Sequence, residues 1–170
     1  IKVGITHGDI NGIGYEVILK TFSDARVAEL CTPVIYGSSK IAAYHRKALE
    51  LPPVNMNIIS QAEDAGINRV NIINCVDDET KVELSQSTSI AGEAAFLALE
   101  AAVSDLKRGA VDVLLTAPIN KHNIQNDQFH FPGHTEYLEE RFGGVGRKAL
   151  MILMKDGLRV ALVTGHIPLS

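Results

Sequence analysis

The sequence predicts an α/β fold with three layers, in which helices cover both faces of a mixed sheet. Short apolar runs that fit buried strands alternate along the chain with longer segments of helical periodicity. The alanine-rich segment 89–108 has the small side chains that let a helix pack closely on a sheet. An Asp-Gly pair between two apolar runs, at Asp156-Gly157, is typical of a hairpin and adds at least one antiparallel pair of strands.

The first predicted element is a strand over residues 1–6 (IKVGIT), which is followed by a glycine-rich turn. A helix comes next, and its periodicity places Ile13, Val17 and Ile18 on the inner face. Asp9 or Asn11 is positioned to cap this helix through its side-chain oxygen. Three glycines within residues 8–14 let the backbone approach a ligand or a neighbouring strand closely.

The next segments extend the same alternation. We predict a short helix over 24–30, a strand over 34–37, and a helix that Ser38 caps, with Ile41 and Tyr44 facing inward. Pro52 and Pro53 end that helix. Segments 56–59 and 70–73 are predicted to be short strands, and the polar run 77–89 a surface loop.

The second half begins with the strongest predicted helix, which opens at Ser89 and ends at Gly109. A buried strand is expected over 111–116, and Pro118 ends it because proline has no N–H to donate. A polar loop then presents Lys121 and His122. The remaining elements are a turn at 132–133, a short helix from 134 with Leu138 and Phe142 on one face, and strands over 149–154 and 158–164.

Composition narrows the class of protein. The chain has 170 residues, 46% of them hydrophobic and 21% charged, with a formal net charge of −4. A mildly acidic chain without a basic cluster argues against nucleic acid as a partner, because phosphates are bound by many Lys and Arg. No apolar run is long enough to span a membrane. Cys31 and Cys75 are read as reduced thiols of a cytoplasmic protein.

Candidate site residues follow three separate predicted strands: Asp9, Lys121 with His134, and His166. If those strands are parallel, their carboxyl ends share one edge of the sheet, where α/β proteins bind ligands. Lys121 would meet a phosphate or carboxylate there. His134 and Thr135 open a helix, whose first-turn amides suit an anionic group.

Two sequence blocks carry a family resemblance: Thr116-Ala117-Pro118-Ile119-Asn120-Lys121, and then Phe131-Pro132-Gly133-His134-Thr135-Glu136-Tyr137-Leu138. Together with Gly8-Asp9 through Glu16 and with Thr164 through Leu169, they resemble the 4-hydroxythreonine-4-phosphate dehydrogenase family of pyridoxal phosphate biosynthesis. The chain departs from the family pattern where Ala117 replaces the usual Gly. It also departs at His7, Ile10 and Tyr15, where the family usually has Pro.

The resemblance implies a fold like that of isopropylmalate dehydrogenase. It also implies that residues 1–170 are the N-terminal portion of a larger two-domain subunit, with an internal boundary expected near residue 130. A homodimer is expected, because the resembled family builds its site from two subunits.

The resemblance also implies an activity, the NAD- or NADP-dependent oxidation of 4-phosphohydroxy-L-threonine followed by decarboxylation. A divalent metal (Zn, Mg or Co), chelated by hydroxyl and carboxylate, would lower the pKa of the substrate's alcohol. His166 is implied as one of three histidine ligands to that metal, and His134 and Thr135 as substrate contacts. Lys121 is a candidate catalytic residue, and no residue is assigned to the dinucleotide.

Two alternatives stay open on the sequence. A paralogous dehydrogenase would oxidise 4-phospho-D-threonate or 4-phospho-D-erythronate by the same chemistry, and the departures around Asp9 keep this interpretation open. A non-catalytic small-molecule binding domain is the alternative from another class, since no dinucleotide fingerprint is recognisable in the chain.

Overall fold

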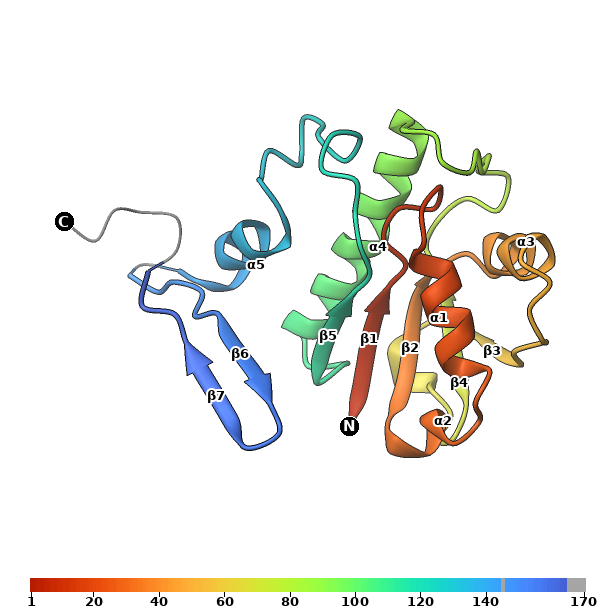
Figure 1. The fold of residues 1–170 in the computed structure, drawn as a ribbon, viewed down its shortest axis with the longest axis horizontal. Helices are drawn as coiled ribbons and strands as arrows, with labels where there is room; N and C mark the ends of the chain where they lie inside the picture. Colours follow the sequence, from red (N-terminus) through yellow and green to blue (C-terminus); the bar gives the residue numbers. More distant parts are fainter. Residues whose placement is uncertain (145, 165–170) are drawn as a thin grey trace. The chain divides into compact units, whose positions relative to one another are not determined.

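The computed structural model describes residues 1–144 and 146–164. Contacts divide the chain into two compact units, unit 1 (Ile1–His130) and unit 2 (from Phe131 onward), and each is described by itself (Figure 1). His166, the predicted metal ligand, lies outside the described residues.

Unit 1 is an α/β domain built on a five-stranded sheet of order β3-β4-β2-β1-β5, in which every pairing is parallel. Its elements are β1 (Lys2–Thr6), α1 (Gly14–Phe22), α2 (Val27–Leu30), β2 (Thr32–Gly37), α3 (Ser39–Ala48), β3 (Met56–Ile59), the 3₁₀ helix η1 (Ala62–Asp64), β4 (Val70–Asn74), α4 (Ser89–Lys107) and β5 (Val113–Thr116).

Helices cover both faces of this sheet, which confirms the predicted layering (Figure 1). Because side chains alternate along a strand, β2 sends Ile35 to the face that α1 covers and Val34 to the face that α4 covers. On the α1 face Ile35 packs in one cluster with Ile18 and Phe22. On the α4 face Val34 packs with small residues such as Ala98, which let the helix lie close to the strands.

The buried faces of α1 and α3 differ from prediction. In α1 the buried stripe is formed by Tyr15, Ile18, Leu19 and Phe22, whose spacing is that of one helical face, while Ile13 and Val17 are 58% and 49% exposed. The predicted face differs because Ile13 precedes the helix and is not part of it. No side chain caps the helix start.

In α3 the cap at Ser38 is confirmed, since its hydroxyl accepts a hydrogen bond from the Ile41 amide at 3.3 Å. Ile41 is buried as predicted, but Tyr44 is 46% exposed, and His45 takes the inward position instead. Histidine is less often buried than apolar residues, so the sequence pattern favoured Tyr44 over the neighbouring His45 as the inward residue.

β5 is an outer strand and is not buried as predicted. Val113 and Leu115 are 47% and 54% exposed, because they lie on the α1 face, and α1 packs over β1, β2 and β4 instead of over β5. Only the other face of the strand, with Leu114, packs against the cluster under α4. The position of β5 at the sheet edge, beside β1, explains its exposure.

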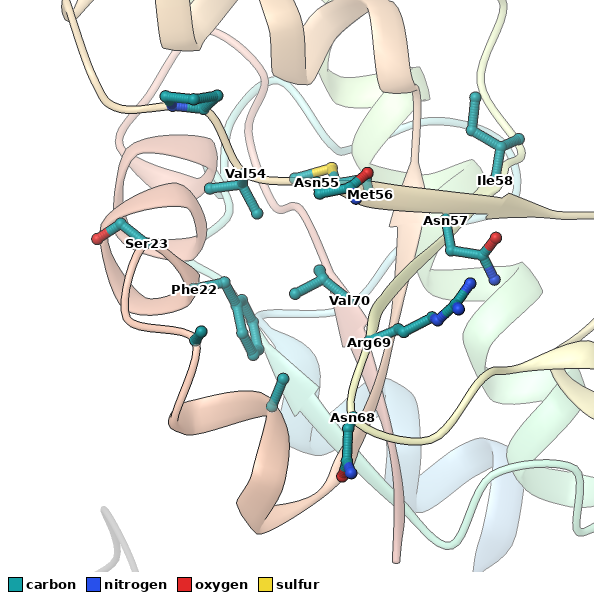
Figure 2. A pocket seen from close by; sticks show the side chains of 13 residues that line it. Phe22, Ser23, Val54, Asn55, Met56, Asn57, Ile58, Asn68, Arg69 and Val70 are labelled. Carbon is teal, nitrogen blue, oxygen red and sulfur yellow. The ribbon is translucent and has the colours of Figure 1, made fainter.

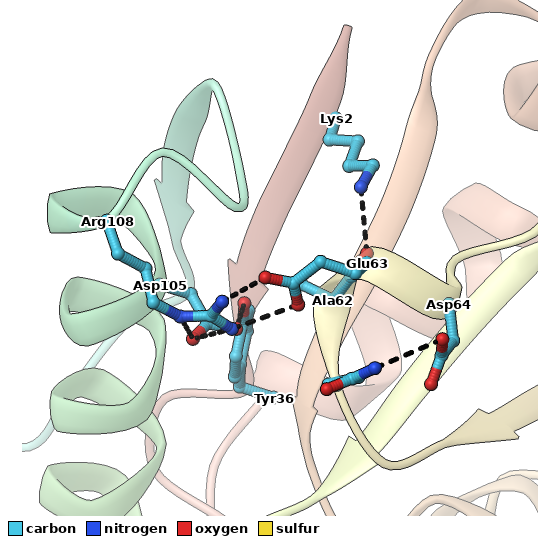
Figure 3. A network of polar contacts seen from close by, with 8 residues as sticks. Lys2, Tyr36, Ala62, Glu63, Asp64, Asp105 and Arg108 are labelled. Atoms are coloured by element: carbon cyan, nitrogen blue, oxygen red, sulfur yellow. Dashed lines mark hydrogen bonds and ion pairs between the residues drawn. The ribbon is translucent and has the colours of Figure 1, made fainter.

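The carboxyl end of α4 is tied to η1 by a surface network (Figure 3). Arg108 pairs with Glu63 and, at 2.8 Å, with Asp105, whose other oxygen accepts a 2.6 Å hydrogen bond from the Tyr36 hydroxyl. Burial and the bond to Asp105 both raise the pKa of Tyr36, so this phenol stays protonated. The network is fully paired and serves the fold.

Unit 2 contains α5 (His134–Phe142) and the strands β6 (Ile152–Lys155) and β7 (Leu158–Ala161). The two strands pair antiparallel across Asp156-Gly157, and Asp156 takes a left-handed backbone with φ of 49°. The predicted hairpin therefore forms, but as a separate two-stranded sheet. The prediction of a single mixed sheet is therefore wrong. The antiparallel pair forms a sheet of its own, and the sheet of unit 1 is wholly parallel among the described residues.

Candidate active site at the switch point of the sheet

The carboxyl ends of β1 and β5 form a topological switch point. After β1 the chain turns toward β2 through α1, whereas α4 carries the chain back across the sheet to β5 on the opposite side of β1 (Figure 1). Ligands of open α/β sheets bind where strand connections diverge in this way. We call the two connections that meet there the β1 loop (residues 7–13) and the β5 loop (residues 117–123).

The two loops touch through their backbones. The amide of Asp9 donates a 2.9 Å hydrogen bond to the carbonyl of Pro118. Between them Gly8 has φ of +70°, and a Cβ there would lie 2.2 Å from the Pro118 oxygen. Glycine is therefore required at this position both for its conformation and for the close approach of the two loops.

Asp9 and Asn11 shape the β1 loop and do not cap α1, contrary to prediction. An oxygen of Asp9 accepts from the Asn11 amide at 2.9 Å. The Asn11 side chain binds the segment before α4 on three atoms: its amide donates to Gln86 O and Thr88 Oγ1, and its oxygen accepts from the Glu83 amide at 2.7 Å. Both side chains are buried, so they hold loops together.

Beneath the β1 loop lies a buried aromatic column that sequence reasoning missed. The rings of His7 and Tyr15 stack with centroids 5.1 Å apart, and Tyr15 stacks on His45 at 5.2 Å. Burial lowers the pKa of His7 to about 4, although the backbone groups of Gly8 and Ala94 partly offset this effect. His7 is therefore neutral at physiological pH.

The β5 loop is the more open of the two. Lys121 and His122 are exposed, and Lys121 makes no ion pair within the described part of the chain. Asn120 sets the shape of the loop, since its side-chain oxygen accepts from the His122 amide at 3.0 Å and its side-chain amide reaches Ser87. Lys121 is thus a cation presented to solvent beside the switch point.

Buried polar atoms without a hydrogen bond of normal geometry gather at this edge of unit 1. They belong to Thr6, which ends β1, to both ring nitrogens of His7, and to the side chain of Asn123 in the β5 loop. Buried polar groups are normally paired, and exceptions are enriched where a ligand or water completes the site. This observation supports the switch point as the functional edge.

In unit 2 His134 and Thr135 open α5, as predicted. Gly133 precedes them in an extended conformation, and no side chain caps the helix start. Thr135 is exposed and His134 is half-buried. The helix is anchored by Tyr137, which is fully buried, meets Phe131 edge-on at 5.4 Å and carries the Arg141 guanidinium over its ring. The amino end of α5, where the helix dipole favours an anion, is thus held in place by the packing of Tyr137.

The described residues contain no group of three His, Cys, Asp or Glu side chains that could hold a metal ion. The described residues therefore do not form a complete site for the metal that the resemblance implies. Cys31 and Cys75 are free thiols, as expected, and burial raises the pKa of Cys75 to about 12. Among the described helices, none is long and apolar enough to cross a membrane.

A cavity of about 680 Å³ lies away from the switch point, where β3 and β4 begin and α1 ends. Figure 2 shows Phe22, Val54 and Val70 around it, with Arg69 extending toward Asn57 at one side. Its position at the amino ends of the strands separates it from the candidate site.

The fold and the switch-point site define this chain as an α/β domain of the kind that binds small ligands at the carboxyl edge of a parallel sheet. Residues 29–170 match the family described as pyridoxal phosphate biosynthetic protein PdxA, and the chain belongs to that family. This confirms the resemblance found in the sequence.

Individual relatives agree with this assignment. The chain is 61% identical to a 4-hydroxythreonine-4-phosphate dehydrogenase of Bacteroides thetaiotaomicron over 99% of its own length and 46% of the relative's. It is 31% identical, over 98% of its length and 50% of the relative's, to a Clostridium botulinum protein provisionally named D-threonate 4-phosphate dehydrogenase.

The crystal structure of a 4-hydroxythreonine-4-phosphate dehydrogenase from Burkholderia phymatum superposes with a TM-score of 0.83 and 30% identity, over 98% of this chain and 50% of that one. The chain spans about half the length of the relatives it matches.

Proposed function

We propose that the protein containing this chain oxidises 4-phosphohydroxy-L-threonine with NAD or NADP and decarboxylates the product, in pyridoxal 5′-phosphate biosynthesis. The observation that carries this proposal is the 61% identity, across 99% of the chain, to a relative named for that substrate. The switch-point geometry supports it, because such an edge suits a small ligand.

Within this proposal the chain's own residues bind and orient the substrate. Lys121 is exposed at the switch point and would attract the phosphate or carboxylate of the substrate. In unit 2 the start of α5, with His134 and Thr135, would bind a second anionic or hydroxyl group of the substrate at the positive end of the helix. A bound divalent metal would supply Lewis-acid activation of the substrate alcohol.

The test is turnover by the full-length protein. We expect NADH or NADPH to form with 4-phosphohydroxy-L-threonine and to cease when a chelator is added. Thermal stabilisation by phosphorylated acids without any dinucleotide reduction would instead favour a non-catalytic binding domain.

A second candidate substrate is 4-phospho-D-threonate or 4-phospho-D-erythronate. The 31% identity to the Clostridium botulinum protein favours it, as do the unusual His7, Ile10 and Tyr15 in the β1 loop and at the start of α1. Parallel measurements of kcat/KM on the amino acid and on the two hydroxy acids decide between the substrates.

We further propose separate roles for two histidines. His166 would bind the metal and His134 the substrate, as the family resemblance implies. We expect His166→Ala to lose metal binding in a calorimetric titration of the full-length protein, and His134→Ala to bind metal normally while its substrate KM rises. The opposite pattern would reverse the two assignments.

The assembly and location are proposals of the same kind. A homodimer is expected from the resemblance, and sedimentation of the full-length protein showing only monomer at micromolar concentration would contradict it. A cytoplasmic location stays a prediction from the unpaired cysteines.

A further inference from the structure

The middle of the β1 loop is held by a single side chain from α3. Nε2 of His45 lies 2.7 Å from the carbonyl oxygen of Ile10, and both residues are buried. A carbonyl only accepts hydrogen bonds, so the geometry assigns the proton of the neutral His45 ring to Nε2. Because burial lowers the pKa of His45, this neutral tautomer is the relevant one.

The orientation of His45 is itself determined by the column of rings. Tyr15 stacks on His45, with an angle of 25° between the two planes, and on His7, with an angle of 10°. The Tyr15 hydroxyl accepts from the Ser38 amide at 2.9 Å and lies 3.3 Å from its carbonyl. A Cβ at Gly37 would lie 2.3 Å from that hydroxyl, so glycine makes room for the column.

Three successive residues of the β1 loop are each held by a different part of the chain. Asp9 joins it to the β5 loop, and Asn11 joins it to the segment before α4. His45 holds Ile10, the residue between these two anchors, and no other residue of the described chain donates to that carbonyl. Without His45 the loop would keep the hydrogen bonds of Asp9 and Asn11 and lose the one at Ile10 between them.

We propose that His45 is a positioning residue of the switch-point site, which keeps the β1 loop in the shape that receives the substrate. The proposal rests on the proposed function, since it takes the switch point as the substrate site. Two of the three rings, and Ile10 itself, occupy positions where the sequence departs from the proline of the resembled family pattern.

Three variants of the full-length protein separate the donor from the ring. His45→Phe keeps a ring in the column and removes the donor, whereas His45→Gln replaces the ring with a side chain whose amide can donate at a similar reach. Lys47→Gln changes an exposed residue of the same helix and is the matched control. Amide hydrogen exchange over residues 8–12 is measured together with kcat and KM for the phosphorylated substrate.

We expect His45→Phe to speed exchange at the amides of Asp9, Asn11 and Gly12 by at least ~10-fold, because a buried carbonyl loses its partner. KM should rise by a similar factor and kcat change less than about twofold. His45→Gln should restore both quantities toward the wild-type values, and Lys47→Gln should match the wild type.

Two results would overturn the proposal. One is a His45→Phe protein with unchanged exchange and KM. The other is exchange that accelerates equally in β1, β2 and β4, because the ring would then support global stability only. Hydrogen exchange needs no substrate, so a wild-type protein that turns over none of the proposed substrates refutes the function while the loop measurement still decides the role of His45.

Discussion

The two loops at the switch point are built in opposite ways. Residues 7–11 of the β1 loop are buried, and the loop is held by its neighbours from three directions, through Asp9, Asn11 and His45. The β5 loop is less buried and offers Lys121 and His122 to solvent. The comparison shows a division of labour, in which one loop provides the shape of the edge and the other provides accessible polar groups. Changes in the first should affect stability, and changes in the second should affect ligand binding.

The largest effect is expected from Gly8→Ala. The new methyl group would meet the Pro118 carbonyl in a left-handed backbone, and overpacking together with this conformation lowers the unfolding free energy by about 2–5 kcal/mol. Urea unfolding measures the loss. Gly12→Ala is the control in the same loop, because its Cβ would meet only ordinary contacts at 3.5 Å and beyond. Equal losses in the two variants would contradict the tight junction between the loops.

The pH dependence of stability gives the next effect. The pKa of His7 is about 4 in the folded protein and 6.5 in the unfolded chain, so the unfolded state binds more protons between these values. The stability contributed by neutral His7 is complete above pH 6.5 and is lost as pH falls toward 4, by roughly 3 kcal/mol. His45, whose pKa is also lowered, acts in the same direction.

Urea unfolding from pH 7 to pH 4 tests this assignment. His7→Phe keeps a ring in the column and removes the titrating group, so its stability should fall much less over the same range. If the unfolding free energy of His7→Phe falls with pH as steeply as that of the wild type, other groups cause the acid sensitivity.

Asn11→Ala should lower the unfolding free energy by about 2 kcal/mol, because it leaves partly buried backbone groups before α4 without their side-chain partner. Asn120→Ala is the matched change in the β5 loop, where water can replace the lost bonds, and should cost less than about 1 kcal/mol. Thermal or urea unfolding of both variants compares the loops directly. A larger loss of stability in Asn120→Ala than in Asn11→Ala would contradict the difference between the two loops.

The smallest effect on stability is expected from Lys121→Ala, within about 0.5 kcal/mol of the wild type, as for most exposed positions. Its effect on function should be larger, with KM for the phosphorylated substrate raised roughly 10-fold by the loss of a charged hydrogen bond. Lys47→Ala provides the control for charge alone. An unaltered KM would remove Lys121 from the site.

The elements of the fold were predictable because each depends on local signals. The cap at Ser38, the end of α4 at Gly109 and the hairpin at Asp156-Gly157 are all present. The strand order was not predictable, since it depends on pairings between distant segments. For the same reason β5 was taken as buried, because its apolar sequence does not reveal that it lies beside β1 at an edge.

The candidate site was predictable only in part. The placement of Asp9 and Lys121 after neighbouring strands followed from the alternation of elements, and the parallel pairing of β1 with β5 agrees with it. The column of His7, Tyr15 and His45 was hidden, because its members come from three elements and each alone resembles an ordinary polar or core residue. A cluster of this kind emerges only when the elements are packed.

The outer edge of β5 has a consequence for how the chain behaves when it is made. Its backbone is unpaired by any further strand of the described residues, and the exposed Val113 and Leu115 flank it. Such an edge is a template on which another copy can add a strand. A recombinant piece limited to unit 1 would therefore self-associate as its concentration rises, and a lysine in place of Val113 would be the simplest gatekeeper against this aggregation.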